Sequence, residues 1–272
     1  MSRDVFDTAE RALNAESGHT TVWSNLGYWR DQSQYPKAAE ALARLLADAV
    51  DLGAQDAVLD LGFGMGEQLR LWRQAYDVQT LHGVNPSASQ NAVARQCVAD
   101  ADYQLSEGLA ETVLPLPGAP AFSKVLMLDC AYHFMSRATV LGRLRGHLTP
   151  DARVGLTDLY LPGAPSAAEA MALRGMCALS RIPYGNLLSR EAYCQQLVQA
   201  GLRVQRFTDI TAEVFAPFAA WWRRYGARHS FPLRDRLKFA TTARFIAAAA
   251  RRATLGYALV VARPLSDGGG PG

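Results

Sequence analysis

The sequence predicts an α/β fold built around a doubly wound, mostly parallel sheet, and three observations support this. Short apolar runs alternate along the chain with stretches whose apolar residues recur at helical spacing. The first such run, AVLDLGF at residues 57–63, is apolar on both faces, as a parallel strand covered by helices must be. A glycine-rich turn then joins this run to the next helical stretch.

Each predicted element rests on its local pattern. Residues 36–52 have apolar residues at helical spacing and end at Gly53, a typical helix stop. Right-handed crossovers between the later strands would bring their carboxyl ends to one edge of the sheet. Beyond the first strand, the same alternation predicts helices at 67–76, 87–99, 137–148 and 190–201, and strands at 80–86, 122–130, 153–160, 203–211 and 255–264.

Length and composition favour one elaborated domain. The chain has 272 residues, of which 49% are hydrophobic, so it can bury a sizeable core. We divide it into an N-terminal helical and aromatic lid segment (1–35), a core domain (36–263) and a glycine-rich flexible tail (264–272). The core domain carries two cap insertions, at about 161–188 and 212–255. Several apolar residues in the first insertion need a partner to bury against; they are Met171, Met176, Leu179, Ile182 and Tyr184.

Composition also argues against several classes of protein. No run approaches the roughly 18 uncharged apolar residues of a membrane span, and the charged N-terminus has no signal-peptide pattern. We therefore expect a cytoplasmic protein. The four cysteines show neither CxxC spacing nor a matching histidine pattern, so we expect no metal site and no disulfide framework.

The turn after the first strand points to a ligand with a cationic end. Its pattern is Asp60-x-Gly62-x-Gly64-x-Gly66, at the carboxyl end of a strand and just before a helix. A dinucleotide fingerprint would need glycine at position 67, where this chain has Glu67. A pyrophosphate is repelled by carboxylates, whereas the ammonium of an amino-acid moiety is attracted by Asp60.

These residues resemble the first motif of class I S-adenosylmethionine-dependent methyltransferases, over roughly residues 20–263. The resemblance implies a Rossmann-like, seven-stranded, mostly parallel sheet with helical cap insertions, and S-adenosyl-L-methionine as cofactor. It is closest to members that act on lipids and small natural products. Three alternatives stay open: a purely structural glycine turn, an inactive cofactor-binding or scaffold protein, and a nicotinamide-dependent reductase.

The resemblance also implies a set of cofactor-binding residues. In this family the second strand usually ends in an acidic residue that binds both ribose hydroxyls, but here Asn85 stands in its place. An amide accepts one hydrogen bond and donates another, so ribose recognition is retained with less charge. The stretch SEGLAETVLPLP matches the family's adenine-covering segment, although it could be an ordinary loop. The expected cofactor-binding residues are Tyr28, Asp60, Gly62, Gly64, Gly66, Gln68, Asn85, Pro86, Gln90, Gly108, Leu109, Ala110 and Asp129.

The segment MLDCAYHFMSR, residues 127–137, holds the candidate catalytic base. In the family this segment passes beside the reactive methyl group. Methyl transfer is an in-line displacement that needs alignment, and a base if the acceptor carries a proton. His133 suits that role, and Asp129 would orient it or contact the cofactor. The alternative is that His133 only packs at a helix start.

Two aromatic regions bear on the acceptor, which we expect to be a small, fairly apolar molecule. The stretch TVWSNLGYWRDQ precedes the sheet, and the 212–255 insertion combines eight aromatic residues with nine basic and two acidic ones in a chain of net charge +3. The insertion is either a solvated helix face or an apolar pocket with a basic rim, suited to a lipid-like or anionic acceptor or to peripheral membrane contact. No nucleic-acid partner is expected. The expected substrate-binding residues are Trp23, Trp29, Tyr132, Tyr184 and Trp221.

Overall fold

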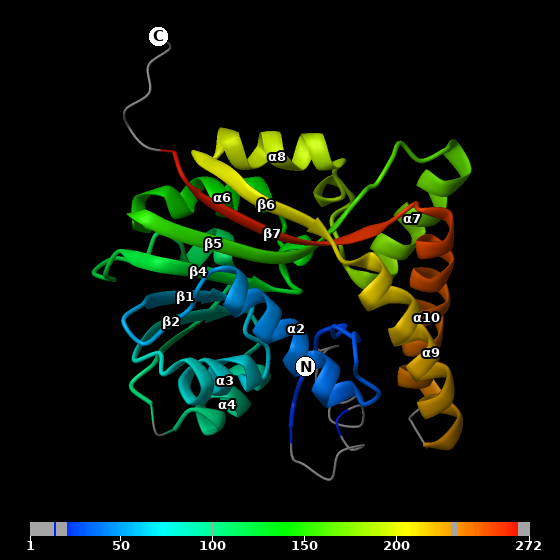
Figure 1. Cartoon of the computed structure of the whole chain (residues 1–272), viewed down its shortest axis with the longest axis horizontal. Coiled ribbons are helices and arrows are strands. Elements are labelled where there is room, and N and C mark those ends of the chain that lie inside the picture. Colours follow the sequence, from blue (N-terminus) through cyan, green and yellow to red (C-terminus); the bar gives the residue numbers. More distant parts are fainter. Residues whose placement is uncertain (1–13, 15–20, 100, 230–232, 266–272) are drawn as a thin grey trace.

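A seven-stranded sheet with strand order β3-β2-β1-β4-β5-β7-β6 forms the centre of the computed structural model (Figure 1), which describes residues 14, 21–99, 101–229 and 233–265. Strands β1 to β5 are parallel, and β7 runs antiparallel to both β5 and β6. The predicted doubly wound, mostly parallel sheet is confirmed. The strands are β1 (Ala57–Leu61), β2 (Thr80–Asn85), β3 (Gln104–Glu107), β4 (Phe122–Leu128), β5 (Leu148–Tyr160), β6 (Leu202–Asp209) and β7 (Gly256–Pro264).

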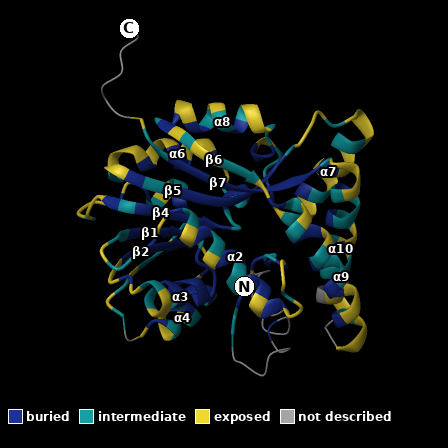
Figure 2. Ribbon diagram, viewed as in Figure 1, coloured by how far each residue is buried: buried dark blue, intermediate teal, exposed yellow. Residues whose placement is uncertain are grey.

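Helices cover both faces of this sheet and divide the core in two. Along β1, Val58 belongs to the core on the side of α2, α3 and α9, whereas Leu59 and Leu61 belong to the core beneath α6 and α8. The central strands are accordingly buried on both faces (Figure 2). The helices are α2 (Tyr35–Ala49), α3 (Glu67–Tyr76), α4 (Ala88–Cys97), α5 (Ala110–Val113), α6 (Arg137–Leu144), α7 (Ala167–Ser180), α8 (Arg190–Gln199), α9 (Thr211–Arg228) and α10 (Leu233–Arg252).

Some element boundaries differ from the sequence prediction. The helix expected over 137–148 ends at Leu144, and a short 3-10 turn leads into β5, which begins at Leu148 rather than at 153. The extra strand residues include exposed Pro150 and Asp151, which carry no apolar signal. Residues 1–13 and 15–20 of the predicted N-terminal lid segment lie outside the described residues; Asn14 is helical, and residues 21–34 form loops and turns. We call residues 22–29 the strap. The flexible tail lies almost entirely outside the described residues.

The basic and aromatic insertion is the helical hairpin of α9 and α10. The aromatic side of α9 is buried: Trp221 stacks on Tyr35 at a centroid distance of 5.1 Å and lies 5.5 Å from Trp29. The arginines whose side chains are described, such as Arg223 and Arg224, face solvent. This arrangement favours the solvated helix face over an apolar pocket with a basic rim.

The other insertion contains α7, which begins with a capping box between Ser166 and Glu169. Its inner side buries Leu173 and Cys177. Ile182, just beyond the helix, is buried as expected, but Met171 and Leu179 are 74% and 79% exposed. These two lie on the side of α7 that faces away from the core, so the neighbouring insertion does not bury them, and their burial against a substrate stays a prediction. Among the described residues, no helix is long and apolar enough to cross a membrane.

Candidate cofactor site and catalytic loop

The turn after β1 needs its three glycines. Gly62, Gly64 and Gly66 have φ angles of 78°, 56° and 90°, a region that L-residues with side chains rarely adopt. A Cβ on Gly62 would lie 2.7 Å from that of Cys130, and one on Gly66 would lie 2.7 Å from Cα of Ala94 in α4. These two glycines let β1 approach the catalytic loop and α4 closely.

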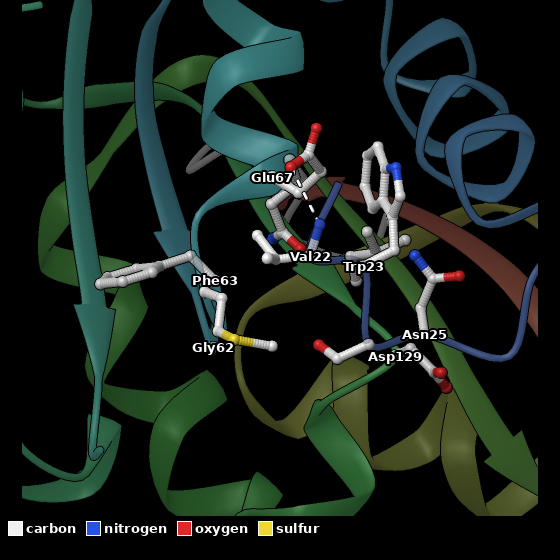
Figure 3. Close-up of a pocket in the computed structure, with 11 residues that line it drawn as sticks. Val22, Trp23, Asn25, Gly62, Phe63, Glu67 and Asp129 are labelled. Atoms are coloured by element: carbon white, nitrogen blue, oxygen red, sulfur yellow. Dashed lines mark hydrogen bonds between the residues drawn. The ribbon is translucent and has the colours of Figure 1, made fainter. Parts of the chain in front are cut away.

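Gly64 instead faces the strap across a pocket. A Cβ built there would lie 3.0 Å from the Ser24 hydroxyl oxygen. The pocket has about 350 Å³ of empty space, counting its open mouth, and lies between the turn, the strap and the end of β4 (Figure 3). Its lining residues are Val22, Trp23, Ser24, Asn25, Gly62, Phe63, Met65, Glu67, Gln68, Leu128 and Asp129. The structure thus brings together predicted residues from three separate segments.

The acidic residue of the motif, Asp60, lies behind the pocket and does not line it. Its carboxylate is fully buried and accepts hydrogen bonds from Gln68 Nε2 at 2.8 Å and Trp72 Nε1 at 2.7 Å. Burial raises the pKa of Asp60 to about 6. Asp60 therefore holds α3 against the turn, and any contact with the cofactor's ammonium stays a prediction.

Asp129, directly after β4, is one of the two carboxylates that do line the pocket. One of its oxygens accepts hydrogen bonds from the Tyr132 hydroxyl at 2.8 Å and the Tyr257 hydroxyl at 2.6 Å. The other accepts from the backbone N–H of Leu26, in the strap, at 2.7 Å. Burial raises the pKa of Asp129 to about 7 despite these three donors. Asp129 thus joins β4, β7 and the strap at the pocket wall.

Glu67, the first residue of α3, is the second carboxylate of the pocket. It is buried, forms an ion pair with Arg70, and accepts a hydrogen bond from the backbone N–H of Val22 at 3.2 Å (Figure 3). Sequence reasoning noticed Glu67 only as a misfit to the dinucleotide pattern. Its place beside the last glycine of the turn was the signal that could have identified it as a pocket residue.

Asn85, at the end of β2, is the centre of a buried amide cluster. Its side-chain oxygen accepts from the Gly64 N–H at 3.3 Å, and its Nδ2 donates to Gln90 at 3.2 Å and Asn91 at 3.1 Å. Its carbonyl accepts from the N–H of Gly108 at 3.2 Å. Asn85 therefore connects the glycine turn with the end of β3.

The remaining predicted cofactor residues lie around this cluster. Gly108 has a φ of 147°, and Ala110 begins α5 and is buried. Pro86 is exposed, and Leu109 is 44% exposed. Tyr28 is half-buried, with the Arg30 guanidinium 5.5 Å from its ring centre. Their contacts with a cofactor stay predictions.

His133 lies in a 3-10 turn, Ala131–His133, that follows Asp129. Its ring is 4.5 Å from that of Tyr132, and its Nδ1 is 3.4 Å from the Arg181 carbonyl oxygen at the end of α7. The hydrogen bonds of Asp129 go to Leu26, Tyr132 and Tyr257 rather than to this imidazole. Among the described contacts, the orientation of His133 therefore comes from Tyr132 and from the chain that follows α7.

The residues predicted to bind substrate lie in three places. Trp23 lines the pocket, and Tyr132 contacts its wall through Asp129. Trp29 and Trp221 are buried against each other in the core between the strap and α9. Tyr184 stacks with Arg174, whose guanidinium lies 4.2 Å from the ring centre. The first of these places is the pocket and its wall, whereas Trp29 and Trp221 hold the strap in place.

The pocket suits the chemistry of S-adenosylmethionine. Two carboxylates, Glu67 and Asp129, line the pocket. The pocket lies next to the glycine turn, where a Cβ added to Gly64 would meet the strap. Opposite charge favours a ligand with ammonium and sulfonium groups, and it disfavours a pyrophosphate. The amide of Asn85 and the backbone at Gly108 extend this site along the sheet edge.

Comparison with known proteins agrees with this geometry. A methyltransferase-domain family model matches residues 59–156. The chain is 30% identical to erythromycin 3''-O-methyltransferase of Saccharopolyspora erythraea, over 77% of this chain and 71% of that protein. It is 29% identical to 27-O-demethylrifamycin SV methyltransferase of Amycolatopsis mediterranei, over 87% of this chain and 88% of that protein.

Solved structures share the fold at lower identity. A cyclopropane synthase from Mycobacterium tuberculosis superposes with a TM-score of 0.74 at 16% identity, covering 96% of this chain and 100% of that one. Geranyl diphosphate C-methyltransferase from Streptomyces coelicolor, solved with S-adenosyl-L-homocysteine, gives 0.71 at 16% identity, covering 96% and 95%. Together with the glycine turn and its carboxylates, these matches show that the chain belongs to the class I S-adenosylmethionine-dependent methyltransferases.

Proposed function

We propose that this methyltransferase methylates a hydroxyl group of a fairly apolar natural product, with His133 as the base. The observation that carries the proposal is the position of His133, four residues after the pocket carboxylate Asp129 and on the same loop after β4. Relatives named for O-methylation of erythromycin and rifamycin compounds support an oxygen acceptor.

The cofactor would be held by groups that follow four strands, β1 to β4. Glu67 and Asp129 would neutralise its cationic groups, and the absence of a side chain at Gly64 keeps the turn from meeting the strap. Asn85 would face the ribose, and residues 108–110 the adenine. Bound there, the cofactor supplies a methyl group on a positively charged sulfur.

His133 would take the hydroxyl proton as the acceptor oxygen attacks the methyl carbon. The carbon–sulfur bond breaks with its electron pair left on sulfur, so the products are a methyl ether, S-adenosylhomocysteine and protonated His133. The protein's main contribution is to align the acceptor in line with the breaking bond.

Two exposed apolar side chains lie close in sequence to the residues of the His133–Arg181 contact. Met135, two residues after His133, is 69% exposed, and Leu179, two residues before Arg181, is 79% exposed. With Met171 of α7 they form what we call the apolar rim. Large exposed apolar groups beside a catalytic loop suit an acceptor with extended hydrophobic surface.

The alternatives left by the sequence are not favoured. A nicotinamide-dependent reductase would need room for a pyrophosphate, which Glu67 and Asp129 disfavour. Titration calorimetry with S-adenosylhomocysteine and with NADH compares the two ligands directly, and we expect heat of binding only from the first. An inactive cofactor-binding protein would bind S-adenosylhomocysteine but transfer no methyl group to any acceptor.

The proposal is tested by His133→Ala in a methyl-transfer assay with a panel of hydroxylated macrocyclic natural products. Loss of a positioned base should lower kcat by about two to four orders of magnitude, while the affinity for S-adenosylhomocysteine stays near normal. His147→Ala is the matched control, because His147 accepts a hydrogen bond from Leu116 far from the pocket. An active but less stable His133→Ala protein would overturn the base assignment.

A further inference from the structure

The loop that carries His133 is held by one side chain from a distant part of the chain. Asn186, in the short 3-10 turn Tyr184–Asn186 after α7, is 96% buried, with 4% of its surface exposed. Its Nδ2 donates to the carbonyl oxygens of Tyr132 at 3.2 Å and Phe134 at 2.6 Å. These are the two residues on either side of His133, so one amide group fixes the backbone before and after the imidazole.

Asn186 is itself held by Arg137, the first residue of α6. The Arg137 backbone N–H donates to the Asn186 side-chain oxygen at 3.3 Å, and Arg137 Nη2 donates to the Asn186 carbonyl at 2.9 Å. Arg137 thus donates to Asn186 from both its backbone and its side chain, and Asn186 accepts with both its side chain and its backbone. Because each contact restricts the other residue, the loop after β4 and the turn after α7 form one unit.

Arg137 is anchored to the sheet by a fully buried ion pair. Its Nη1 donates to Asp158, near the end of β5, at 2.6 Å, and its Nε donates to Gln196 of α8 at 2.8 Å. The guanidinium also stacks on the Tyr193 ring at 3.9 Å, and the Tyr193 hydroxyl donates to Asp158 at 2.7 Å. Each of the three guanidinium nitrogens thereby donates to a different residue: Nε to Gln196, Nη1 to Asp158 and Nη2 to Asn186.

The chain around Asn186 also contacts the imidazole. The Arg181 carbonyl lies 3.4 Å from His133 Nδ1, at the long end of the hydrogen-bonding range. A carbonyl at this position can accept a hydrogen bond from Nδ1–H, which favours the neutral tautomer in which Nε2 carries the lone pair. The chain between the end of α7 and Asn186 therefore contacts both the ring of His133 and the backbone on either side of it.

We propose that Asn186 is a positioning residue for His133, which it holds through the backbone and aligns with the carbonyl of Arg181. The inference rests on the proposed role of His133 as the base. The described hydrogen bonds of the Asn186 side chain join it to the His133 loop and to Arg137. None joins it to a residue that lines the pocket or to a residue of the apolar rim. Its effect on turnover therefore runs through His133. Misplacement of a reacting group by about 1 Å costs on the order of 100-fold in rate.

Two variants of the full chain test the inference. Asn186→Ala removes both donors, and Asn186→Asp keeps the shape and the acceptor for Arg137 but donates to neither carbonyl. We expect kcat to fall about 10- to 100-fold in both, while KM for the acceptor and the Kd for S-adenosylhomocysteine stay within about threefold. Ser189→Ala is the matched control, because it removes only the N-cap of α8 next to this turn and lowers stability without touching the His133 loop.

A second measurement needs no acceptor. Long-range ¹H–¹⁵N spectra of the histidine rings, assigned with His133→Ala, report which nitrogen carries the proton. We expect the Nδ1-protonated form in the wild type and in Ser189→Ala, and a mixture richer in the Nε2-protonated form in both Asn186 variants. An unchanged His133 tautomer in these variants overturns the inference whatever the turnover. If His133→Ala retains turnover, the base assignment fails instead, and the spectra still decide whether Asn186 positions the ring.

Discussion

Gly64 is the glycine of the turn at which an added side chain would point at the strap. Its φ of 56° and its approach to Ser24 both oppose a side chain. We expect Gly64→Val to raise the Kd for S-adenosylhomocysteine at least about 100-fold, or roughly 2.7 kcal/mol, as measured by calorimetry. Gly53→Val serves as control, because a Cβ there meets nothing within 4 Å. Wild-type affinity in Gly64→Val would place the cofactor elsewhere.

Asp129 should make stability and binding depend on pH near neutrality. Burial raises its pKa from 3.8 to about 7, so its contribution to stability is complete below about pH 4 and is lost as pH rises through about 7. We expect the wild-type Tm to fall more between pH 6 and pH 8 than that of Asp129→Asn. Affinity for S-adenosylhomocysteine should rise over the same range in the wild type, because the ionised carboxylate attracts its ammonium. Equal pH slopes of Tm in the two proteins would contradict this.

The contrast between Asp60 and Asp129 shows what a motif can and cannot predict at the residue scale. The turn was recognisable in the sequence because three positive φ angles in so short a stretch favour glycine at each of the three positions. Which carboxylate faces the pocket depends on partners remote in the sequence, such as Trp72 for Asp60 and Tyr257 for Asp129. Asn186 was missed for the same reason, since nothing around it marks a contact with residue 133.

Among the elements, α9 joins the C-terminal hairpin to the strap. Trp221 is 1% exposed and packs against Trp29 and Tyr35. We expect Trp221→Ala to lower the free energy of unfolding by about 3–5 kcal/mol, and to weaken S-adenosylhomocysteine binding because the strap loses its support. Denaturant unfolding and calorimetry measure the two effects. Arg223→Ala, at an exposed position of the same helix, should change stability by less than about 0.5 kcal/mol.

Two-sided burial gave the clearest sequence signal for a strand. The strands β1, β4 and β7 are buried along nearly their whole length, so their residues form readable apolar runs. The edge strand β3, with sequence QLSE, has no fully buried residue and gives no such signal. The sequence shows the charges of α9 and α10 directly. It does not show that their aromatic residues pack inward, because the partners they pack against lie far away in the sequence.

At the scale of the whole molecule, we expect the apolar rim to contribute to the affinity for the acceptor and not to the affinity for the cofactor. Met171 and Leu179 are largely exposed, so replacing both by Gln should leave Tm nearly unchanged. We expect KM for an apolar acceptor to rise about tenfold, since each side chain contributes on the order of 1 kcal/mol of burial, while the Kd for S-adenosylhomocysteine stays constant. Val198→Gln, exposed on α8, is the control. Unchanged KM in the double variant would remove α7 from the acceptor site.

The place of β7 in the sheet has a consequence for biosynthesis. The edge strand β6 pairs with β7 alone among the described strands, and β7 also completes β5. Both pairings must therefore wait until residues 256–264 have left the ribosome, after every other strand. Tyr257, the second residue of β7, also brings a hydroxyl to Asp129. The β5–β7 and β6–β7 pairings and the Tyr257 contact at the pocket wall thus become possible in the same step of translation.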